Sequence, residues 1–513
     1  MKAGDYVVRG DQPFRTLADM YFSIQNYAPQ NPSPYDDTGW TFQYMRDVKI
    51  LPVGDKSILD QPMTLLTADA KAPGGVEGTG SVLVVEHTAD NTLVTFRFKN
   101  AGVRMLAAED DFELNGRTFR AGSIVVPDAD RAKLEPMLKD LGLSAWAVPA
   151  APNVKTHDLD VPRIGYIHSW TRTQDEGWWR AALDTFGVPY TYFADQKLKD
   201  GSLRSKYDVL IFPHVGGSAV SQVNGMPTVG NTPLPYRKTA ETPNLGFVDQ
   251  SDDIRGGMGI EGLIELAKFV QEGGTLITEG STAIIFPEYG LTTSVTVEEP
   301  AQLFVRGSIL RARISDMKSP IAYGFGSIEL PVYFNQAPVL NVAAGGFGGG
   351  GFAGGGRGGA PGANPNAGIG QNVTPNAVPL RIQPFEADQA PAPSTRGDRP
   401  AADDMARVRQ GAQQPSTATS EARPRVVMQF AGDANSLLLS GTLANGQLLT
   451  NRAAALDYPL GKGHVVMFAI RPFWRWQTQG TYPLGFNAIM NWNDLDAGRQ
   501  AGGGRTTETI QPR

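Results

Sequence analysis

The chain has 513 residues, enough for two or three domains that each bury a core. Its formal net charge of −6 at pH 7 argues against a nucleic-acid surface, because such surfaces are basic. The chain contains no cysteine, which excludes disulfides, thiolate nucleophiles and cysteine-ligated zinc, and no apolar run reaches the roughly 18 residues of a membrane span.

The first residues predict a strand followed by a helix. The strand-like run Tyr6–Val8 begins almost at once, which favours a chain cut from a longer one, and no apolar signal-peptide core precedes it. Apolar residues then recur at helical spacing; they are Phe14, Leu17, Ala18, Tyr21 and Ile24.

A small α/β unit follows. Ser81–His87 reads as a strand, and Leu93–Lys99 alternates apolar and polar residues, which predicts a second strand. Asn115-Gly116 stands between alternating apolar residues and predicts a hairpin. Ala129–Gly142 predicts a helix that ends at glycine. We assign residues 1–150 to an N-terminal α/β region.

The stretch from Pro162 to Gly280 predicts an open α/β sheet. Short apolar runs alternate with helical segments, and connections of this length require parallel pairing with right-handed crossovers. We expect a flavodoxin-like parallel sheet. Its predicted strands are Arg163–His168, Pro189–Ala194, Asp208–Val215 and Thr275–Gly280, and its predicted helices are Asp175–Gly187 and Gly257–Gly274.

After Gly280 the chain becomes rich in strand-like segments and is then interrupted. Residues 344–424 are dominated by Gly, Pro, Ala, Ser and Gln, and we expect a disordered insertion because they offer little apolar surface to bury. Strand-like runs resume behind the insertion. We therefore predict one domain made of residues 160–343 and 425–496, with a β-rich C-terminal part.

Two stretches carry a resemblance to a known family. PYDDTGWTFQ at Pro34–Gln43 resembles the region that follows the catalytic domain in large bacterial zinc carboxypeptidases of the carboxypeptidase A-like family, and Gly461–Trp492 resembles the C-terminal end of the same proteins. Pro162–Gly280 resembles a class I glutamine amidotransferase-like domain, as also found in some β-galactosidases. The resemblance implies a secreted or periplasmic protein.

The zinc site of that family does not carry over to this chain. The peptidases hold zinc with a His-x-x-Glu pair and a distant histidine. None of the five histidines here has glutamate three positions later, and His87-Thr-Ala-Asp90 is a partial match at a strand end; the five are His87, His157, His168, His214 and His464. We expect no cofactor in this chain, zinc only in an upstream peptidase domain, and no activity from the chain alone.

The amidotransferase chemistry requires a cysteine nucleophile on a strand-to-helix turn. Ser281 follows the strand Thr275–Gly280 at such a turn. One alternative is therefore a serine hydrolase that uses Ser281 with His168 or His214 as the base. The sequence Glu-Gly-Ser-Thr-Ala around Ser281 is not the G-x-S-x-G turn of serine hydrolases.

His168 and His214 stand at the predicted C-terminal ends of two parallel strands. Ligands of open α/β sheets gather at that edge, so we predict a ligand site there, although polar residues are also ordinary where strands meet loops. Its other candidate residues are Ser169, Trp170, Arg172, Gly216, Gly217 and Ser281. A long loop from Gly216 to Arg255 is a candidate lid.

Three functions follow from these observations. The first is an accessory, non-catalytic C-terminal region of a zinc carboxypeptidase, with an upstream peptidase domain as its partner. The alternatives are a module that binds a small sugar or peptide at the strand-end edge, and the serine hydrolase. We expect no nucleic-acid partner and no membrane span.

Overall fold

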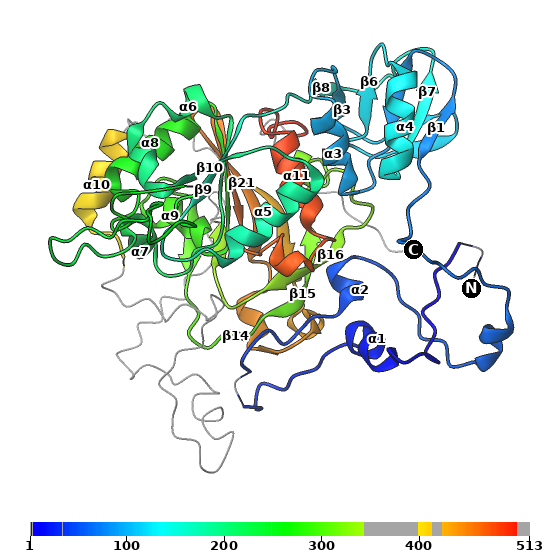
Figure 1. Ribbon diagram of the computed structural model, residues 1–513, viewed down its shortest axis with the longest axis horizontal. Coiled ribbons are helices and arrows are strands. Elements are labelled where there is room, and N and C mark those ends of the chain that lie inside the picture. The colour runs from blue at the N-terminus through cyan, green and yellow to red at the C-terminus, as the bar shows by residue number, and fades with distance from the viewer. Residues whose placement is uncertain are drawn as a thin grey trace, which may run out of the picture.

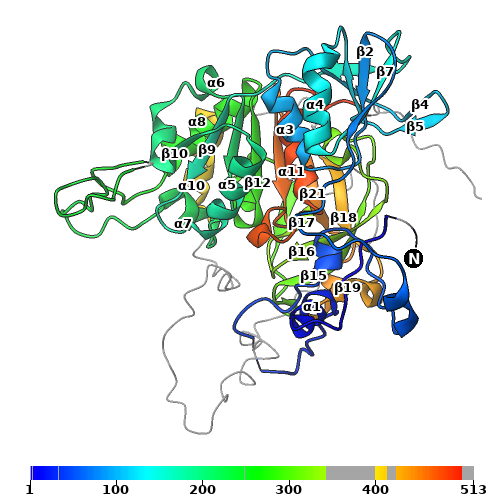
Figure 2. The same cartoon turned by 45° about the vertical axis from the view of Figure 1, so that its right-hand side comes forward.

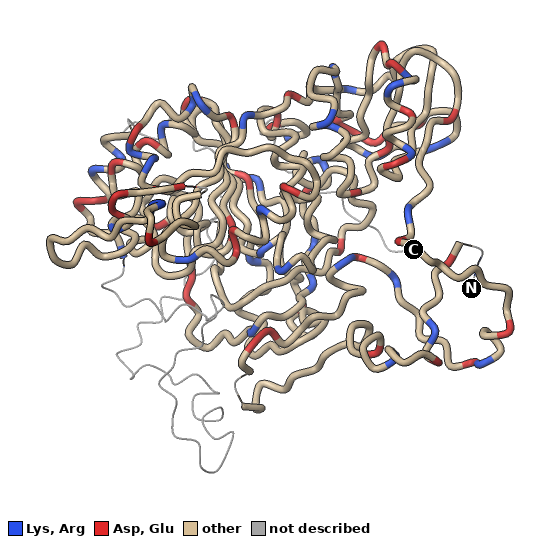
Figure 3. The backbone as a smooth tube through the Cα atoms, in the orientation of Figure 1, with Lys and Arg blue, Asp and Glu red and all other residues tan. Residues whose placement is uncertain are grey.

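The computed structural model describes residue 2 and residues 4–32, 34–247, 249–342, 399–412 and 423–499. Two sheets organise these residues, a smaller one at the upper right of Figure 1 and a larger one at its centre. No helix in these ranges combines the length and the apolar character needed to cross a membrane. Basic and acidic residues are interspersed over both parts of the molecule (Figure 3).

The smaller sheet has six strands in the order β1-β7-β2-β6-β3-β8. Its strands are β1 Gly75–Gly78, β2 Val82–Val85, β3 Leu106–Ala108, β6 Ile124–Val126, β7 Ser144–Val148 and β8 Thr156–Asp158. Helices α3 (Thr92–Lys99) and α4 (Arg131–Leu141) pack their apolar residues on one face of this sheet. The hairpin of β4 (Phe112–Leu114) and β5 (Arg117–Phe119) packs on the other face.

The predicted hairpin is confirmed, and the predicted strand at Leu93–Lys99 is wrong. Asn115 and Gly116 join β4 to β5 with φ of +52° and +76°, the left-handed pair that two-residue hairpin turns use. Leu93–Lys99 instead forms helix α3, and its residues 93–98 are all buried. A helix buried on all sides lacks the polar stripe that would have distinguished it from a strand.

The larger sheet begins with five parallel strands in the order β10-β9-β11-β12-β22. They are β9 Ile164–His168, β10 Thr191–Ala194, β11 Val209–Phe212, β12 Thr275–Glu279 and β22 Gly463–Phe468. Numbered along the chain this order is 2-1-3-4-5, which is that of flavodoxin-like sheets. The predicted flavodoxin-like parallel sheet is confirmed.

Both faces of the parallel part are covered, because successive side chains in each strand point to opposite faces. In β11, Val209 and Ile211 join one core with α5 (Gln174–Phe186) and α11 (Tyr482–Met490). Leu210 and Phe212 join the opposite core with α8 (Gly259–Gln271). Shorter helices complete this second side; they are α7 Ala219–Asn224 and α9 Ile285–Glu288.

Beyond β22 the same sheet continues with antiparallel strands, so the β-rich C-terminal part is confirmed. β21 pairs with β22, β18 with β21, β15 with β18 and β16 with β15. The remaining strands are β13 Val295–Glu298, β14 Phe304–Val305, β15 Ser308–Ile314, β16 Glu329–Phe334, β17 Val339–Val342, β18 Arg425–Phe430, β19 Leu438–Ser440, β20 Leu443–Ala444 and β21 Ala453–Leu460.

The predicted disordered insertion lies mostly outside the described residues, but residues 399–412 do not fit that prediction. They contain helix α10 (Ala402–Gly411), which packs against α8 (Figure 1). Val408 and Ala412 are fully buried in the same core as α8. The prediction missed this short amphipathic helix because the sequence around it is rich in Gly, Pro and Ala. Contacts with α8 stabilise the helix.

The N-terminal segment, residues 4–66, lies along the outside of the molecule (Figure 1). It contains α1 (Arg15–Phe22), which has no buried residue, and α2 (Phe42–Met45), which packs on β16. This segment holds most of the large apolar side chains that the described residues expose. Figure 2 shows α1 below the antiparallel part of the large sheet.

Candidate functional site

The C-terminal ends of the parallel strands meet at one edge of the large sheet. His168 ends β9, Glu279 ends β12, and His214 follows β11 by two residues. All three side chains are buried. The edge carries two neighbouring groups of side chains, which we call the His168 cluster and the His214 cluster.

The His168 cluster consists of His168, Trp170, Glu176, Tyr192 and Asp249. The His168 ring stacks on Tyr192 with centroids 4.8 Å apart, and its edge meets Trp170 at 4.3 Å. Its Nδ1 lies 3.8 Å from Glu176 Oε2, and its Nε2 lies 4.0 Å from Asp249 Oδ2. Neither ring nitrogen has a hydrogen-bond partner among the described residues.

Burial determines the protonation states in the His168 cluster. It lowers the pKa of His168 to about 4, so the ring is neutral at pH 7. It raises the pKa of Glu176 to about 8, against the opposing hydrogen bond from the Tyr192 hydroxyl. Asp249 accepts hydrogen bonds from the Ala194 backbone N–H and from Lys197 Nζ, at 2.7 and 2.5 Å.

The long loop between α7 and α8 covers the His168 cluster and is attached at its C-terminal base. Asp249 belongs to this loop, and Gln196 Nε2 donates to the backbone oxygens of Asp253, Arg255 and Gly256. Tyr236 of the loop contacts the Trp170 ring at 4.8 Å. The rest of the loop is largely exposed and projects from the molecule (Figure 2).

The His214 cluster is built around one imidazole with two polar neighbours. Its Nδ1 accepts a hydrogen bond of 2.9 Å from the Ser281 backbone N–H, and Arg471 Nη2 lies 3.1 Å from its Nε2. Arg471 also pairs with Asp175 at 3.4 Å. Burial, together with the charges of Arg471 and Arg172, lowers the pKa of His214 well below its usual value.

The geometry does not give Ser281 a catalytic base. Ser281 Oγ accepts backbone N–H bonds from Val215 and Gly216, at 3.1 and 2.7 Å. The nitrogen of His214 nearest to Ser281 binds the backbone N–H of that residue, not its hydroxyl. This arrangement fixes the loop after β11 to the turn after β12, and it differs from the serine–histidine pair of a hydrolase.

The other predicted site residues line the same edge. Ser169 Oγ lies 2.8 Å from Thr171 Oγ1, and Ser169 forms a backbone bridge with Arg172. Gly216 adopts φ of +85°, and a side chain there would meet the Arg172 guanidinium at 3.0 Å. Gly217 has φ of +79°. The eight predicted residues thus fall into the two clusters and the loops that join them.

Sequence reasoning missed several residues of this edge, including Tyr192 in β10. Glu176 stands in the first turn of α5. Acidic residues are common there because they stabilise a helix N-terminus, so the sequence offered no reason to assign Glu176 to the site. Arg471 follows the apolar run of β22, and Glu279 ends β12, which are signals that strand-end reasoning could have used. Asp249 lies inside the loop, and nothing in the sequence marks it.

Arg471 also links the edge to the N-terminal segment through aromatic residues. Its guanidinium lies over the Trp474 ring at 4.7 Å. Trp474 stacks on Tyr333 at 4.4 Å, and both donate hydrogen bonds to Asp37. Arg475, next to Trp474, pairs with Asp36 at 2.8 Å. The segments Pro34–Gln43 and Gly461–Trp492 therefore contact each other.

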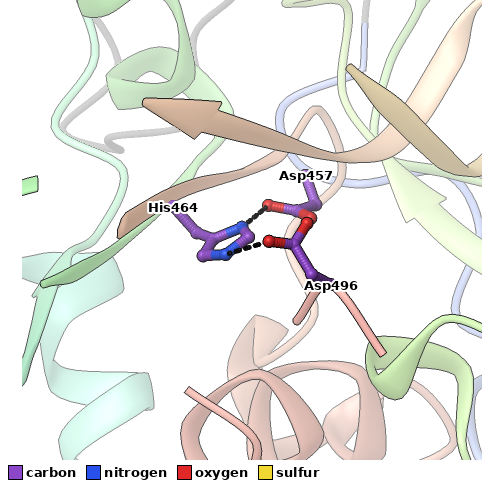
Figure 4. Close-up of side chains that lie close together, drawn as sticks. All are labelled: Asp457, His464 and Asp496. Carbon is purple, nitrogen blue, oxygen red and sulfur yellow. Dashed lines mark hydrogen bonds and ion pairs between the residues drawn. The ribbon is translucent and has the colours of Figure 1, made fainter. Parts of the chain in front are cut away.

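Among the described residues, one group of side chains has the spacing of metal ligands: Asp457, His464 and Asp496 (Figure 4). His464 Nδ1 lies 2.8 Å from Asp457 Oδ1, and its Nε2 lies 3.7 Å from Asp496 Oδ2. Arg499 pairs with both carboxylates at 3.0 Å. Burial lowers the pKa of His464, but the charge and hydrogen bond of Asp457 outweigh it and the pKa is raised.

This group does not fit a zinc ion. A metal needs deprotonated ligands, whereas the raised pKa of His464 favours the protonated ring. The guanidinium of Arg499 pairs with both carboxylates and would compete with a metal ion for their oxygens. We interpret the group as an ion-pair network that stabilises the packing of the segment after α11 on β21 and β22.

No family model and no curated protein matches the chain. Among solved structures, two cytoplasmic proteins from Salmonella typhimurium align with TM-scores of 0.30 and 0.28 at 11% and 10% identity. These two alignments each cover 64% of this chain, and they cover 97% and 99% of the other chains. A ThuA-like protein from Bacteroides uniformis aligns with a TM-score of 0.21 at 8% identity, over 38% of this chain and 64% of its own. At such scores the fold assignment rests on the strand order of the large sheet.

Proposed function

We propose that this chain is an accessory, non-catalytic region that packs against the zinc-binding peptidase domain of a carboxypeptidase A-like enzyme. The observation that carries the proposal is the apolar surface of the N-terminal segment. The zinc and the peptidase activity would belong to the partner domain. Proteolysis would be the activity of the whole enzyme.

Helix α1 presents apolar side chains to solvent. Phe14, Leu17 and Met20 are 69%, 47% and 41% exposed, and no residue of the helix is buried. Leu51 and Leu65, further along the segment, are 69% and 85% exposed. Exposed apolar surface costs free energy in water, about 25 cal/mol per Å², so a partner that covers these side chains would be stabilised by their burial.

The segment is fixed to the large sheet close to this apolar surface. Asp37 accepts hydrogen bonds from Trp474 and Tyr333, and Thr41 Oγ1 donates to Ser440 Oγ at 2.9 Å. Because these contacts hold the segment in place, a partner would bind it with less loss of chain entropy. Residues 34–43 make several of these contacts. They resemble the region after the peptidase domain in this family, which supports that domain as the partner.

The histidines of the smaller sheet support a structural role. His87 Nε2 lies 3.0 Å from Asn487 Oδ1, and His157 Nε2 lies 2.9 Å from Asn491 Oδ1. Both asparagines lie at the end of the chain, in α11 and directly after it. These pairs join the smaller sheet to the C-terminal helix, so the rings act as contacts between elements.

The test mixes the chain with a zinc-loaded carboxypeptidase A-like domain encoded in the same reading frame or operon, and measures complex formation by analytical ultracentrifugation. We expect a one-to-one complex that the triple variant Phe14→Ser, Leu17→Ser and Met20→Ser weakens at least tenfold. The control variant Arg15→Ser with Asp19→Ser changes the polar side of the same helix and retains binding. Equal binding by both variants, or carboxypeptidase activity of the chain alone, contradicts the proposal.

A second candidate function is a module that binds a small sugar or peptide at the strand-end edge. The unpartnered ring nitrogens of His168, buried beneath the loop, favour it. A thermal-shift screen with small sugars and peptides tests it. We expect a ligand to raise the unfolding midpoint of the chain and not that of His168→Asn; no shift with any compound contradicts it.

A further inference from the structure

We propose that the His168 cluster binds a neutral, polyhydroxylated ligand of the saccharide class, enclosed by the loop between α7 and α8. The inference rests on the ligand-binding function proposed above and narrows it from a sugar or peptide to a neutral sugar. Three properties of the cluster carry it: its unpartnered polar atoms, its balanced charge and its aromatic rings.

The cluster contains buried polar atoms without hydrogen-bond partners among the described residues. They are His168 Nδ1 and Nε2, Trp170 Nε1 and Glu176 Oε2. A neutral histidine offers one donor and one acceptor, and the indole offers a donor. A hydroxyl group can both donate and accept a hydrogen bond. Several hydroxyls on one ligand could therefore pair with the donors and the acceptors of the cluster. Buried polar atoms without partners are rare, and several gathered around one ring indicate a ligand.

The charges of the cluster are balanced without a ligand. Lys197 Nζ lies 2.5 Å from the Asp249 carboxylate. Arg180, whose guanidinium lies over the Tyr192 ring, bonds the Tyr190 hydroxyl, which in turn donates to Asp184. A charged ligand would bring an uncompensated charge into a buried position, where the lost hydration of that charge opposes binding. Peptides carry charged termini, so this balance favours a neutral ligand.

Aromatic side chains surround His168, and opening of the loop would expose the part of the Trp170 ring that Tyr236 contacts. Tyr192 stacks on the His168 ring, Trp170 meets it edge-on, and Tyr236 packs against Trp170 from the loop. Sugar rings carry C–H groups on their faces and hydroxyls around their edges. An arrangement with aromatic faces and polar atoms close together binds both parts of such a ring.

Entry to the cluster requires the loop to move, because His168 is buried under it. The base of the loop is held by Asp249 and by the bonds from Gln196 to residues 253–256. The outer part carries exposed Phe247 and Val229. Tyr236 reaches back from this part to Trp170, and therefore opening of the loop uncovers the aromatic side of the cluster.

The experiment measures binding of maltotriose, cellotriose and xylotriose to the purified chain by tryptophan fluorescence and calorimetry, with trialanine and glucuronic acid as charged probes. We expect at least one neutral trisaccharide to bind and to quench the fluorescence. Tyr236→Ala should weaken that binding at least tenfold. The matched control Phe247→Ala, on the same loop and 94% exposed, should change it less than twofold.

His168→Asn is a second variant that keeps a polar side chain of smaller size, and it should also lose at least tenfold in affinity. Circular dichroism melts confirm that each variant is folded. Binding of trialanine or glucuronic acid that Tyr236→Ala abolishes, without sugar binding, overturns the inference and leaves the ligand-binding function standing. If none of the probes binds, or if Phe247→Ala is as harmful as Tyr236→Ala, the inference is also overturned.

Discussion

The indole Nε1 of Trp474 donates a hydrogen bond of 2.8 Å to Asp37 Oδ2, which joins residues 437 positions apart. Tyr333 donates to the other oxygen of the same carboxylate, also at 2.8 Å. Trp474 is fully buried, and the Asp37 side chain beside it is only 8% exposed. This carboxylate is therefore one of the contacts that fix the N-terminal segment to the core.

Replacing Asp37 with alanine should destabilise the chain. Two buried donors lose a charged acceptor, and hydrogen bonds to charged groups contribute about 1.5–3 kcal/mol each. We expect urea unfolding to show a loss of at least about 2 kcal/mol. Asp36→Ala is the matched control, because Asp36 is 39% exposed in its pair with Arg475 and should cost less than about 1 kcal/mol. Equal effects of the two variants contradict the assigned role of Asp37.

Acid should destabilise the chain through His87. Burial lowers the pKa of this histidine to about 4, against the opposing hydrogen bond of Asn487. The unfolded state therefore takes up a proton near pH 6.5 and the folded state only near pH 4, so stability is lost as pH falls between these values. The His87 contribution is about 3 kcal/mol.

The measurement is the free energy of unfolding from pH 4 to 8 for the parent chain and for His87→Gln, which should lose this part of the pH dependence. His464→Gln is an instructive comparison, because the raised pKa of His464 acts with the opposite sign. The stability that His464 contributes is present below about pH 6.5 and is lost as pH rises through its folded pKa. An unchanged pH profile for His87→Gln contradicts the prediction.

Glu279→Gln should stabilise the chain at alkaline pH. Burial and then the neighbouring Asp175 raise the pKa of Glu279, so the folded state retains a proton that the unfolded state has lost. The parent chain therefore loses stability as pH rises above about 4.5, and the neutral amide does not. We expect a gain of more than about 1 kcal/mol at pH 8 and almost none at pH 4. A loss of stability at pH 8 would show that Glu279 is ionised in the fold.

The purified chain should bind no stoichiometric zinc. The carboxylates of Asp457 and Asp496 are paired with Arg499, and His464 is favoured in its protonated form. We expect elemental analysis after dialysis against zinc to find far less than one ion per chain, and EDTA to leave the unfolding midpoint unchanged. One zinc per chain that is lost in Asp457→Asn contradicts the ion-pair interpretation.

Val408→Asp should detach helix α10. Val408 is fully buried against α8, and an unpaired carboxylate there costs several kcal/mol. Ala406→Asp is the matched control, because this residue is exposed on the same helix and the change should cost less than about 1 kcal/mol. Thermal unfolding and limited proteolysis measure both. Equal unfolding midpoints of the two variants contradict the packing of α10 on α8.

Local patterns were enough to predict the parallel sheet. Strands β9, β11 and β12 are marked by apolar runs, and helices α4 and α5 end at glycines. Both signals can be recognised from a few consecutive residues. Gly142 and Gly187 adopt φ of +71° and +69°, as residues that end helices commonly do. The same reasoning failed at α3, where burial on all sides removes the polar face, and at α10, where a biased composition surrounds a short helix.

The candidate site was predictable in its position but not in its contacts. Strand-end reasoning places His168 and His214 at one edge because parallel strands share their direction. It could not place Asp249, which reaches β10 from the middle of a loop, or show that the Ser281 hydroxyl accepts backbone bonds. Such contacts depend on the path of a loop relative to distant strands, and the periodicity of apolar residues along the sequence does not predict that path.

The sequence by itself determined the strands and the main helices of the parallel sheet, because backbone preference and apolar periodicity act over a few residues. The tertiary structure alone decided that β22 completes the parallel sheet beside β12, although the long insertion separates them in the chain. It likewise decided that Asp37 meets Trp474. Both contacts form because distant segments bury apolar faces against each other and pair their buried polar groups. The free energy that stabilises them therefore depends on the whole fold.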